Sequence, residues 1–126
     1  MQVVIVEPEK KPFVQNIDDT LTSMQQIVGG TIQAVYPFEE PVALICNDEG
    51  KLLGLPLNRA LRDEEGRIYD IVAGTFFLCA APEGSDRLES LTEEQASCFK
   101  KQFLCPQAFI MMGGNLICLN DDTDMC

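Results

Sequence analysis

The stretch IYDIVAGTFFLC, residues 68–79, decides the fold class because it predicts a long strand in the second half of the chain. Its residues are mainly β-branched, aliphatic or aromatic, the composition typical of strands. Gly74 interrupts the run, and a glycine inside a strand indicates a bulge or a close approach of another group to the backbone. We therefore expect one long apolar strand here, distorted at Gly74.

Four further segments predict strands or turns on the N-terminal side of this stretch. VVIV, residues 3–6, is a continuous apolar run bounded by Pro8, which predicts a buried strand in the centre of a sheet. Residues 31–36 and 42–46 are rich in strand-forming residues, and the prolines of PFEEP mark the connection between them. NDEG, residues 47–50, predicts a turn, so that this region forms a meander.

Two segments predict helices. The first spans residues 18–28 and should end at Gly29 and Gly30. The second should begin at Thr92, which forms a capping box with Gln95, and should end at Cys105 because Pro106 follows. The apolar positions of these helices, at helical spacing, are Leu21, Met24, Ile27 and Val28 in the first and Ala96, Phe99 and Phe103 in the second.

Together these elements predict a small α+β single domain, with a mixed, mostly antiparallel sheet and two main helices in the order β-α-β-β-β-α. AFIMMGGNLICLN, residues 108–120, adds a terminal hairpin that turns at Gly113, Gly114 and Asn115. The length of 126 residues suits one domain. We expect its core in residues 1–105, followed by a C-terminal extension, 106–126, whose acidic end, NDDTDMC, frays.

The charge of the chain excludes several classes of partner. Nine Lys and Arg stand against twenty Asp and Glu, which gives a formal net charge of −11. Such a charge argues against direct binding to nucleic acids or anionic membranes. The acids are scattered along the sequence, which favours a role in solubility over mimicry of DNA. No apolar run is long enough to span a membrane, and we expect a cytoplasmic protein.

The sequence does not contain a recognisable catalytic or metal-binding set. It has no His and no CxxC pair, so neither a nucleophile with its usual base nor a zinc site is predicted, and we expect no cofactor. Cys46 and Cys79 lie in apolar runs and are expected in the core. The densest carboxylates could serve a metal or acid–base chemistry, but they also fit an exposed turn. They are Asp63, Glu64, Glu65 and Asp70.

GLPLNRALRDEEG, residues 54–66, is the best candidate site because it places polar groups between apolar positions. Arg59 and Arg62 are three residues apart, and in a helical turn they would project to one side. Guanidinium groups suit carboxylate or phosphate oxygens, and Asn58 could add directional hydrogen bonds. The alternative is that both arginines pair with the acids at 63–65 and 70 and hold an irregular loop in place.

Several motifs in this order resemble an uncharacterised bacterial family, domain of unknown function 3846 (DUF3846). They are VVIVEPEKKP, LTSMQQIVGGTIQAVYPFEEPVALICNDEGKLLGLPLNRAL, IYDIVAGTFFLCA and LTEEQASCFKKQF, within about the first 105 residues. The resemblance implies a small α+β domain in a bacterial, phage or mobile-element setting, without established catalytic residues, cofactor or substrate. Its matching segment makes these positions candidates for a site: Cys46, Asn47, Gly50, Gly54, Leu55, Pro56, Asn58 and Arg59.

We therefore predict a non-enzymatic binding or interaction module with a site around residues 54–75 for a small anion or a partner protein. The predicted site residues are Asn47, Asn58, Arg59, Arg62, Asp70 and Gly74. One alternative is an acidic DNA mimic that inhibits a host DNA-binding enzyme. Another is an enzyme that uses Asp63, Glu65 or Asp70 with a metal or as acid–base groups. The apolar C-terminal hairpin could also join copies of the chain in a homo-oligomer.

Overall fold

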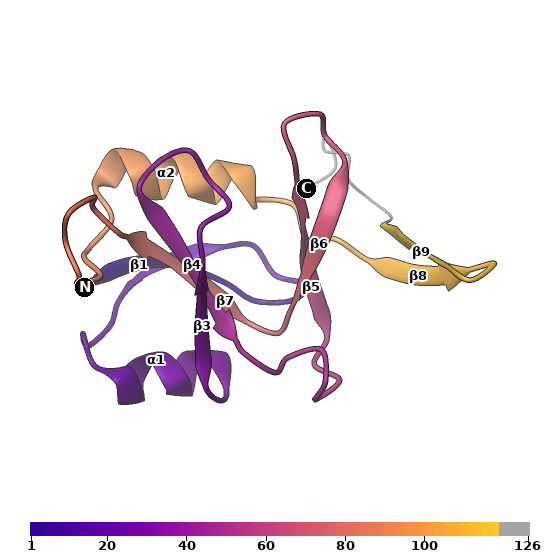
Figure 1. Cartoon of the computed structure of the whole chain (residues 1–126), viewed down its shortest axis with the longest axis horizontal. Helices are drawn as coiled ribbons and strands as arrows, with labels where there is room; N and C mark the ends of the chain where they lie inside the picture. Colours follow the sequence, from indigo (N-terminus) through magenta and orange to yellow (C-terminus); the bar gives the residue numbers. More distant parts are fainter. Residues whose placement is uncertain (119–126) are drawn as a thin grey trace.

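The computed structural model describes residues 1–118, and the acidic end that we expect to fray lies outside these residues. Five strands form the main sheet in the order β2-β1-β7-β4-β3, and every neighbouring pair is antiparallel (Figure 1). Their bounds are β1 Gln2–Val6, β2 Phe13–Asn16, β3 Ile32–Val35, β4 Val42–Asn47 and β7 Phe76–Ala80. The α+β class with a mostly antiparallel sheet is confirmed. The VVIV segment is an interior strand as predicted, while β7 takes the central position.

One helix lies on each face of the main sheet (Figure 1). Helix α1, Leu21–Val28, begins after Thr20, whose hydroxyl accepts a hydrogen bond from the Ser23 amide, and ends at Gly29. Helix α2, Glu93–Gln102, has the predicted capping box of Thr92 and Gln95. It ends three residues before the predicted end at Cys105, because Phe103, the C-cap, has φ −107° and ψ 20°, outside the helical range.

The two faces of the sheet bury separate halves of the core. Met24 and Val28 of α1 pack with Val3, Ile45 and Phe77 on one face. On the other face, side chains of α2 and of a second, small sheet cover Val4, Leu44 and Leu78; they are Ala96, Phe99, Leu61 and Val72. Because successive residues of a strand point to opposite faces, the continuous apolar runs of β1, β4 and β7 supply both halves.

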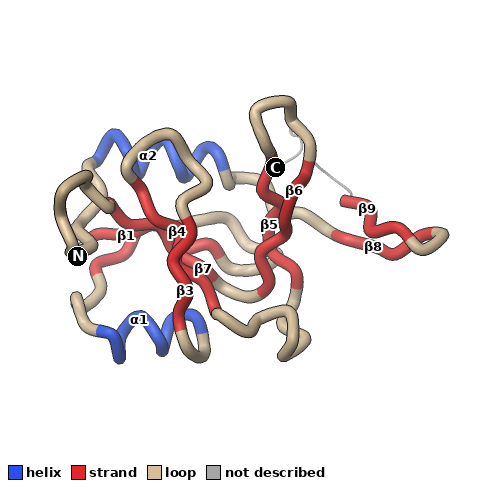
Figure 2. The backbone as a smooth tube through the Cα atoms, in the orientation of Figure 1, coloured by secondary structure: helices blue, strands red, loops and turns tan. Residues whose placement is uncertain are grey.

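The predicted single strand over residues 68–79 is wrong, because Gly74 divides it between two sheets. Strand β6, Ile68–Ala73, pairs with β5, Leu57–Arg62, in the two-stranded sheet, whereas β7 begins at Phe76 in the main sheet (Figure 2). Gly74 has φ +85°, and a Cβ at this position would lie 2.8 Å from Leu55 Cδ1. The expected close approach to the backbone is therefore confirmed, and it coincides with the passage between the sheets.

The predicted C-terminal hairpin is confirmed. Strands β8, Phe109–Met112, and β9, Asn115–Cys118, pair with each other and project from the rest of the molecule (Figure 1). Gly113 and Gly114 form the turn with φ +61° and +84°, the positive values that a tight type I′ turn requires. Asn115 begins β9 and is not part of the turn. Neither helix in residues 1–118 is long and apolar enough to cross a membrane.

Candidate functional site

Strand β5 places the polar residues of the candidate stretch inside the molecule, and a bulge sets their orientation. In the pairing with β6, Leu57 lies opposite Ala73 and Arg59 opposite Val72, so Asn58 is an extra residue on β5. Asn58 is fully buried, and its Nδ2 donates to the carbonyl oxygens of Val6 and Gly74, each at 2.9 Å. Asn58 thus joins β5 to the main sheet at the Gly74 junction.

Arg59 is 1% exposed, and carbonyl oxygens surround its guanidinium group. Nε and Nη2 donate to the Phe103 carbonyl at 3.2 and 3.0 Å, and Nη2 also donates to the Lys10 carbonyl at 2.7 Å. Nη1 donates to Oδ1 and to the backbone carbonyl of Asn58, at 2.9 and 3.4 Å. These five bonds use all five N–H groups, so Arg59 ties β5 to the end of α2 and to the loop before β2.

Arg59 has no carboxylate partner among the described ion pairs. Burial lowers the pKa of its guanidinium from 12.5 to about 10, because desolvation disfavours the charged form. At neutral pH the group is still charged. The fold therefore holds a buried positive charge within β5 at neutral pH, and carbonyl dipoles stabilise it.

Arg62, at the end of β5, is exposed, and its Nη1 donates to the Gly66 carbonyl at 2.9 Å. The prediction of a helical turn with both arginines on one side is wrong, since residues 57–62 form a strand. The alternative of ion pairs with the neighbouring acids is also wrong for residues 1–118, where neither arginine forms one. Arg62 is therefore an exposed cation without a described carboxylate partner.

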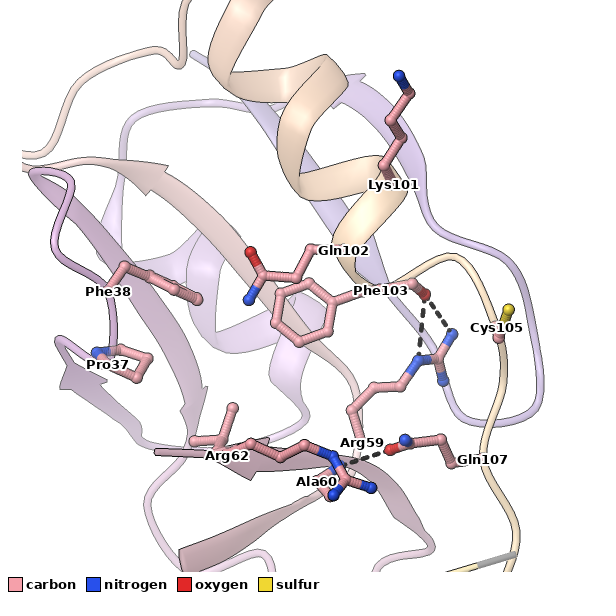
Figure 3. Close-up of a pocket in the computed structure, with 11 residues that line it drawn as sticks. Pro37, Phe38, Arg59, Ala60, Arg62, Lys101, Gln102, Phe103, Cys105 and Gln107 are labelled. Carbon is pink, nitrogen blue, oxygen red and sulfur yellow. Dashed lines mark hydrogen bonds between the residues drawn. The ribbon is translucent and has the colours of Figure 1, made fainter. Parts of the chain in front are cut away.

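A pocket of about 410 Å³ lies between β5 and the end of α2 (Figure 3). Arg59, Arg62 and Lys101 give it three positive charges, and none of its described lining residues is Asp or Glu. Figure 3 shows the Gln102 amide beside the rings of Phe38 and Phe103. The side chain of Gln107, opposite, accepts a hydrogen bond from the Ala60 amide at 2.7 Å through Oε1, and this bond does not use the two N–H donors of Nε2. The pocket combines cations, amides and an apolar wall.

The structure separates the remaining predicted site residues from this pocket. Asn47 is buried, donates to the Val28 carbonyl at 3.2 Å and accepts from the Glu49 amide at 2.8 Å, which fastens the end of α1 to the turn after β4. Asp70 forms an exposed ion pair with Lys51. Gly74 lies against Leu55. Of the six predicted residues, only Arg59 and Arg62 line the pocket.

The carboxylates considered for metal or acid–base chemistry do not all share one site, because Asp70 lies apart from the other three. Asp63 Oδ1 accepts from the amides of Glu65 and Arg67, each at 2.9 Å, and so fixes the β5–β6 turn. Asp63 and Glu65 line a broad pocket near the β3–β4 loop, whereas Asp70 lines a different, smaller one. In residues 1–118 no three Asp, Glu, Cys or His side chains are arranged to hold a metal ion.

Sequence reasoning missed several residues that complete the pocket. Lys101 belongs to the last turn of α2, where cations are common because they favour the negative end of the helix dipole. Pro37 and Phe38 come from the connection between β3 and β4, and Gln107 follows α2. Cations and aromatic residues such as Lys101 and Phe38 are typical of binding sites, but no local sequence pattern indicates that these three segments meet beside β5.

No curated protein and no solved structure matches the chain. The model of the family described as a domain of unknown function, DUF3846, matches residues 1–104, which end just after α2 and exclude the β8–β9 hairpin. This match spans most of the 126 residues, and the chain therefore belongs to the DUF3846 family.

Proposed function

We propose that this chain is a non-enzymatic binding module whose ligand is a small organic anion held in the pocket between β5 and the end of α2. The main observation in favour is charge. In a chain of net charge −11, three cations line one pocket, and no carboxylate stands among its described lining residues. A local positive field of this kind raises the concentration of an anion above its value in solution.

The three cations have different roles in this proposal. Arg59 is buried and its five N–H groups are already bonded, so it contributes attraction and no direct hydrogen bond. Arg62 and Lys101 are exposed, and neither forms an ion pair with a described carboxylate. Their head groups are the direct contacts for phosphate or carboxylate oxygens, which charge-assisted hydrogen bonds hold well.

The rest of the lining favours an anion with an apolar or aromatic body. Phe38 packs against Phe99 and Phe103, with ring centroids 4.6 and 6.2 Å apart, and Phe38 and Phe103 line one wall of the pocket. The amides of Gln102 and Gln107 add donors and acceptors. A volume of about 410 Å³ lies within the range of small-molecule sites.

Thermal unfolding in the presence of anions tests the proposal. The panel consists of inorganic phosphate, a nucleoside monophosphate and an aromatic carboxylate. A ligand that binds only the folded chain raises its stability, by about 2.7 kcal/mol at 100 times the dissociation constant. We expect the organic anions to raise the melting temperature, and R62Q and K101Q to remove most of this rise.

Lys100 supplies a matched control, because it neighbours Lys101 on α2 but does not line the pocket. K100Q changes the net charge by the same amount and should leave the ligand effect intact. The proposal is wrong if no anion in the panel raises the melting temperature. It is also wrong if K100Q and K101Q reduce the rise equally, since that result indicates non-specific attraction.

A second candidate function is mimicry of DNA, as an inhibitor of a host DNA-binding enzyme. Five carboxylates from the β3–β4 loop and the β5–β6 turn line one broad pocket of about 750 Å³; they are Glu39, Glu40, Asp63, Glu64 and Glu65. Amide substitution at 63–65 should abolish inhibition of such an enzyme but should not weaken anion binding, because it removes negative charge beside Arg62. For both candidates the expected setting is the cytoplasm of a bacterium, with the protein as an accessory factor of the cell or of a mobile element.

A further inference from the structure

The β8–β9 hairpin exposes apolar side chains that the anion pocket does not use. Ile110, Met111, Met112 and Leu116 are 38%, 67%, 58% and 43% exposed. Residues 107–118 include no charged side chain, although the whole chain has a net charge of −11. Figure 1 shows the hairpin projecting beyond the β5–β6 sheet, away from both helices. It is therefore an uncharged apolar arm on a strongly acidic body.

A hairpin with exposed apolar side chains needs a packing partner that buries them. An isolated two-stranded hairpin is at best marginally stable in water, and a third strand or a packed helix is normally required. In residues 1–118, β8 and β9 pair with each other and with no other strand. Neighbouring residues Ile110 and Met111 point to opposite faces of the ribbon because side chains alternate along a strand, so both faces are apolar.

We propose that a second copy of this chain is the packing partner, through antiparallel pairing of β8 with β8 of that copy. A strand that pairs antiparallel with its own copy is related to it by a twofold axis, so one sequence supplies both complementary surfaces. The two hairpins then form a four-stranded sheet, with the two β8 strands at its centre and the backbone groups of their open edges bonded.

The distribution of charge favours this occupant. Two bodies of net charge −11 repel each other, and the uncharged arm is a place where two copies can meet without close contact of their acids. β8 is flanked by the uncharged Gln107 and Ala108 and by the glycine turn. The sequence after β9 includes two acids, Asp121 and Asp122, whereas no acid directly flanks β8, and acidic flanking sequence disfavours pairing. β8 is accordingly the edge that pairs.

The test is the mass of the full chain in solution, measured by sedimentation velocity over a range of concentrations. The interface is small, and we expect a dimer with a dissociation constant of roughly micromolar order. The proposed pairing is centred on Met111, so M111K places like charges close together at the twofold axis and should give a monomer. L52K is the matched control, because Leu52 is 87% exposed and lies outside the hairpin. L52K should dimerise as the original chain does.

Mixing two variants separates this pairing from loss of folding. M111D should also be monomeric alone, whereas an equal mixture of M111K and M111D should form dimers, because opposite charges then face each other across the axis. A chain that remains monomeric up to roughly 100 μM overturns the proposal, as does dimerisation of M111K alone. A mixture that stays monomeric while the original chain dimerises overturns the β8–β8 pairing.

Discussion

Arg59 shows how a single buried cation can be stabilised without an ion pair. Its guanidinium has five N–H groups, and the fold supplies an acceptor for each from Asn58, Lys10 and Phe103. Carbonyl oxygens satisfy hydrogen bonds but do not cancel the charge, which explains why desolvation lowers the pKa of the group. The charge therefore acts on its surroundings, and the nearest open space is the pocket.

We predict that R59A destabilises the protein by about 2–4 kcal/mol, because it leaves a cavity and several buried acceptors without donors. R59K keeps the charge but has three donors on one atom, which cannot reach acceptors on opposite sides, so we expect a loss of about 1–3 kcal/mol. Urea unfolding measures both values. R67A, at an exposed arginine, should change stability by less than about 0.5 kcal/mol. An R59K variant as stable as the original chain would contradict this account.

Two buried thiols predict a pH dependence of stability. Burial raises the pKa of the Cys79 thiol from 9.0 to about 12, with a smaller contribution from Asp19. Burial also raises the pKa of Cys46, followed by the charges of Asp70 and Asp48. Above pH 9 these thiols ionise in the unfolded chain but stay protonated in the folded one. For Cys79 this contribution to stability is present below pH 9 and is lost as the pH rises from 9 toward 12, and Cys46 acts in the same direction.

Urea unfolding between pH 8 and pH 10 measures this effect as a fall in the free energy of unfolding. The double variant C46A/C79A should be less stable at every pH but should show a shallower fall, because two of the responsible groups are gone. C98A removes an exposed thiol and should retain the original slope. Equal slopes for the original chain and C46A/C79A would contradict the assignment.

Among the elements, those with regular patterns could be predicted from the sequence, and β5 could not. The apolar runs of β1, β4 and β7 and the capping box of α2 are local signals, and the structure has each of them. In β5, Leu57, Ala60 and Leu61 recur at helical spacing. The bulge at Asn58 shifts the register by one residue, which removes the alternation by which a strand is recognised. Asn58 and Arg59 are buried although both are polar, so the sequence pattern did not indicate a buried strand.

Gly74 lies where the chain passes from the small sheet to the main sheet, and we predict that replacing it destabilises the protein. In G74A the alanine must adopt φ +85°, and its Cβ would lie 2.8 Å from Leu55 Cδ1. We therefore expect the free energy of unfolding to fall by about 2–4 kcal/mol. G66A is the control, because Gly66 has φ +81° with open space around it, and only the backbone strain of about 1 kcal/mol applies. Chemical denaturation compares them. Equal losses would show that the Leu55 contact has no energetic role.

For the whole molecule, the candidate site depends on segments that are distant in sequence. The β3–β4 connection, β5, the end of α2 and Gln107 meet only because the small sheet packs beside α2 on the main sheet. Composition indicated the unusual stretch at 54–66, and Arg59 and Arg62 do line the pocket. Lys101, Gln102 and Phe38 required the tertiary arrangement, because no local pattern encodes contacts across such separations.

The net charge of the whole chain predicts opposite effects of salt on folding and on ligand binding. With −11 on 126 residues, charge repulsion destabilises the compact state, and added NaCl screens it. The melting temperature of the free protein should therefore rise by a few degrees between low salt and about 0.5 M NaCl.

Over the same range the additional rise caused by an organic anion should shrink, because salt also screens Arg59, Arg62 and Lys101. Sucrose, which stabilises proteins without screening charge, should raise the melting temperature but leave the ligand effect unchanged. A ligand effect that does not diminish with NaCl would mean that the pocket's positive charge is not what holds the anion.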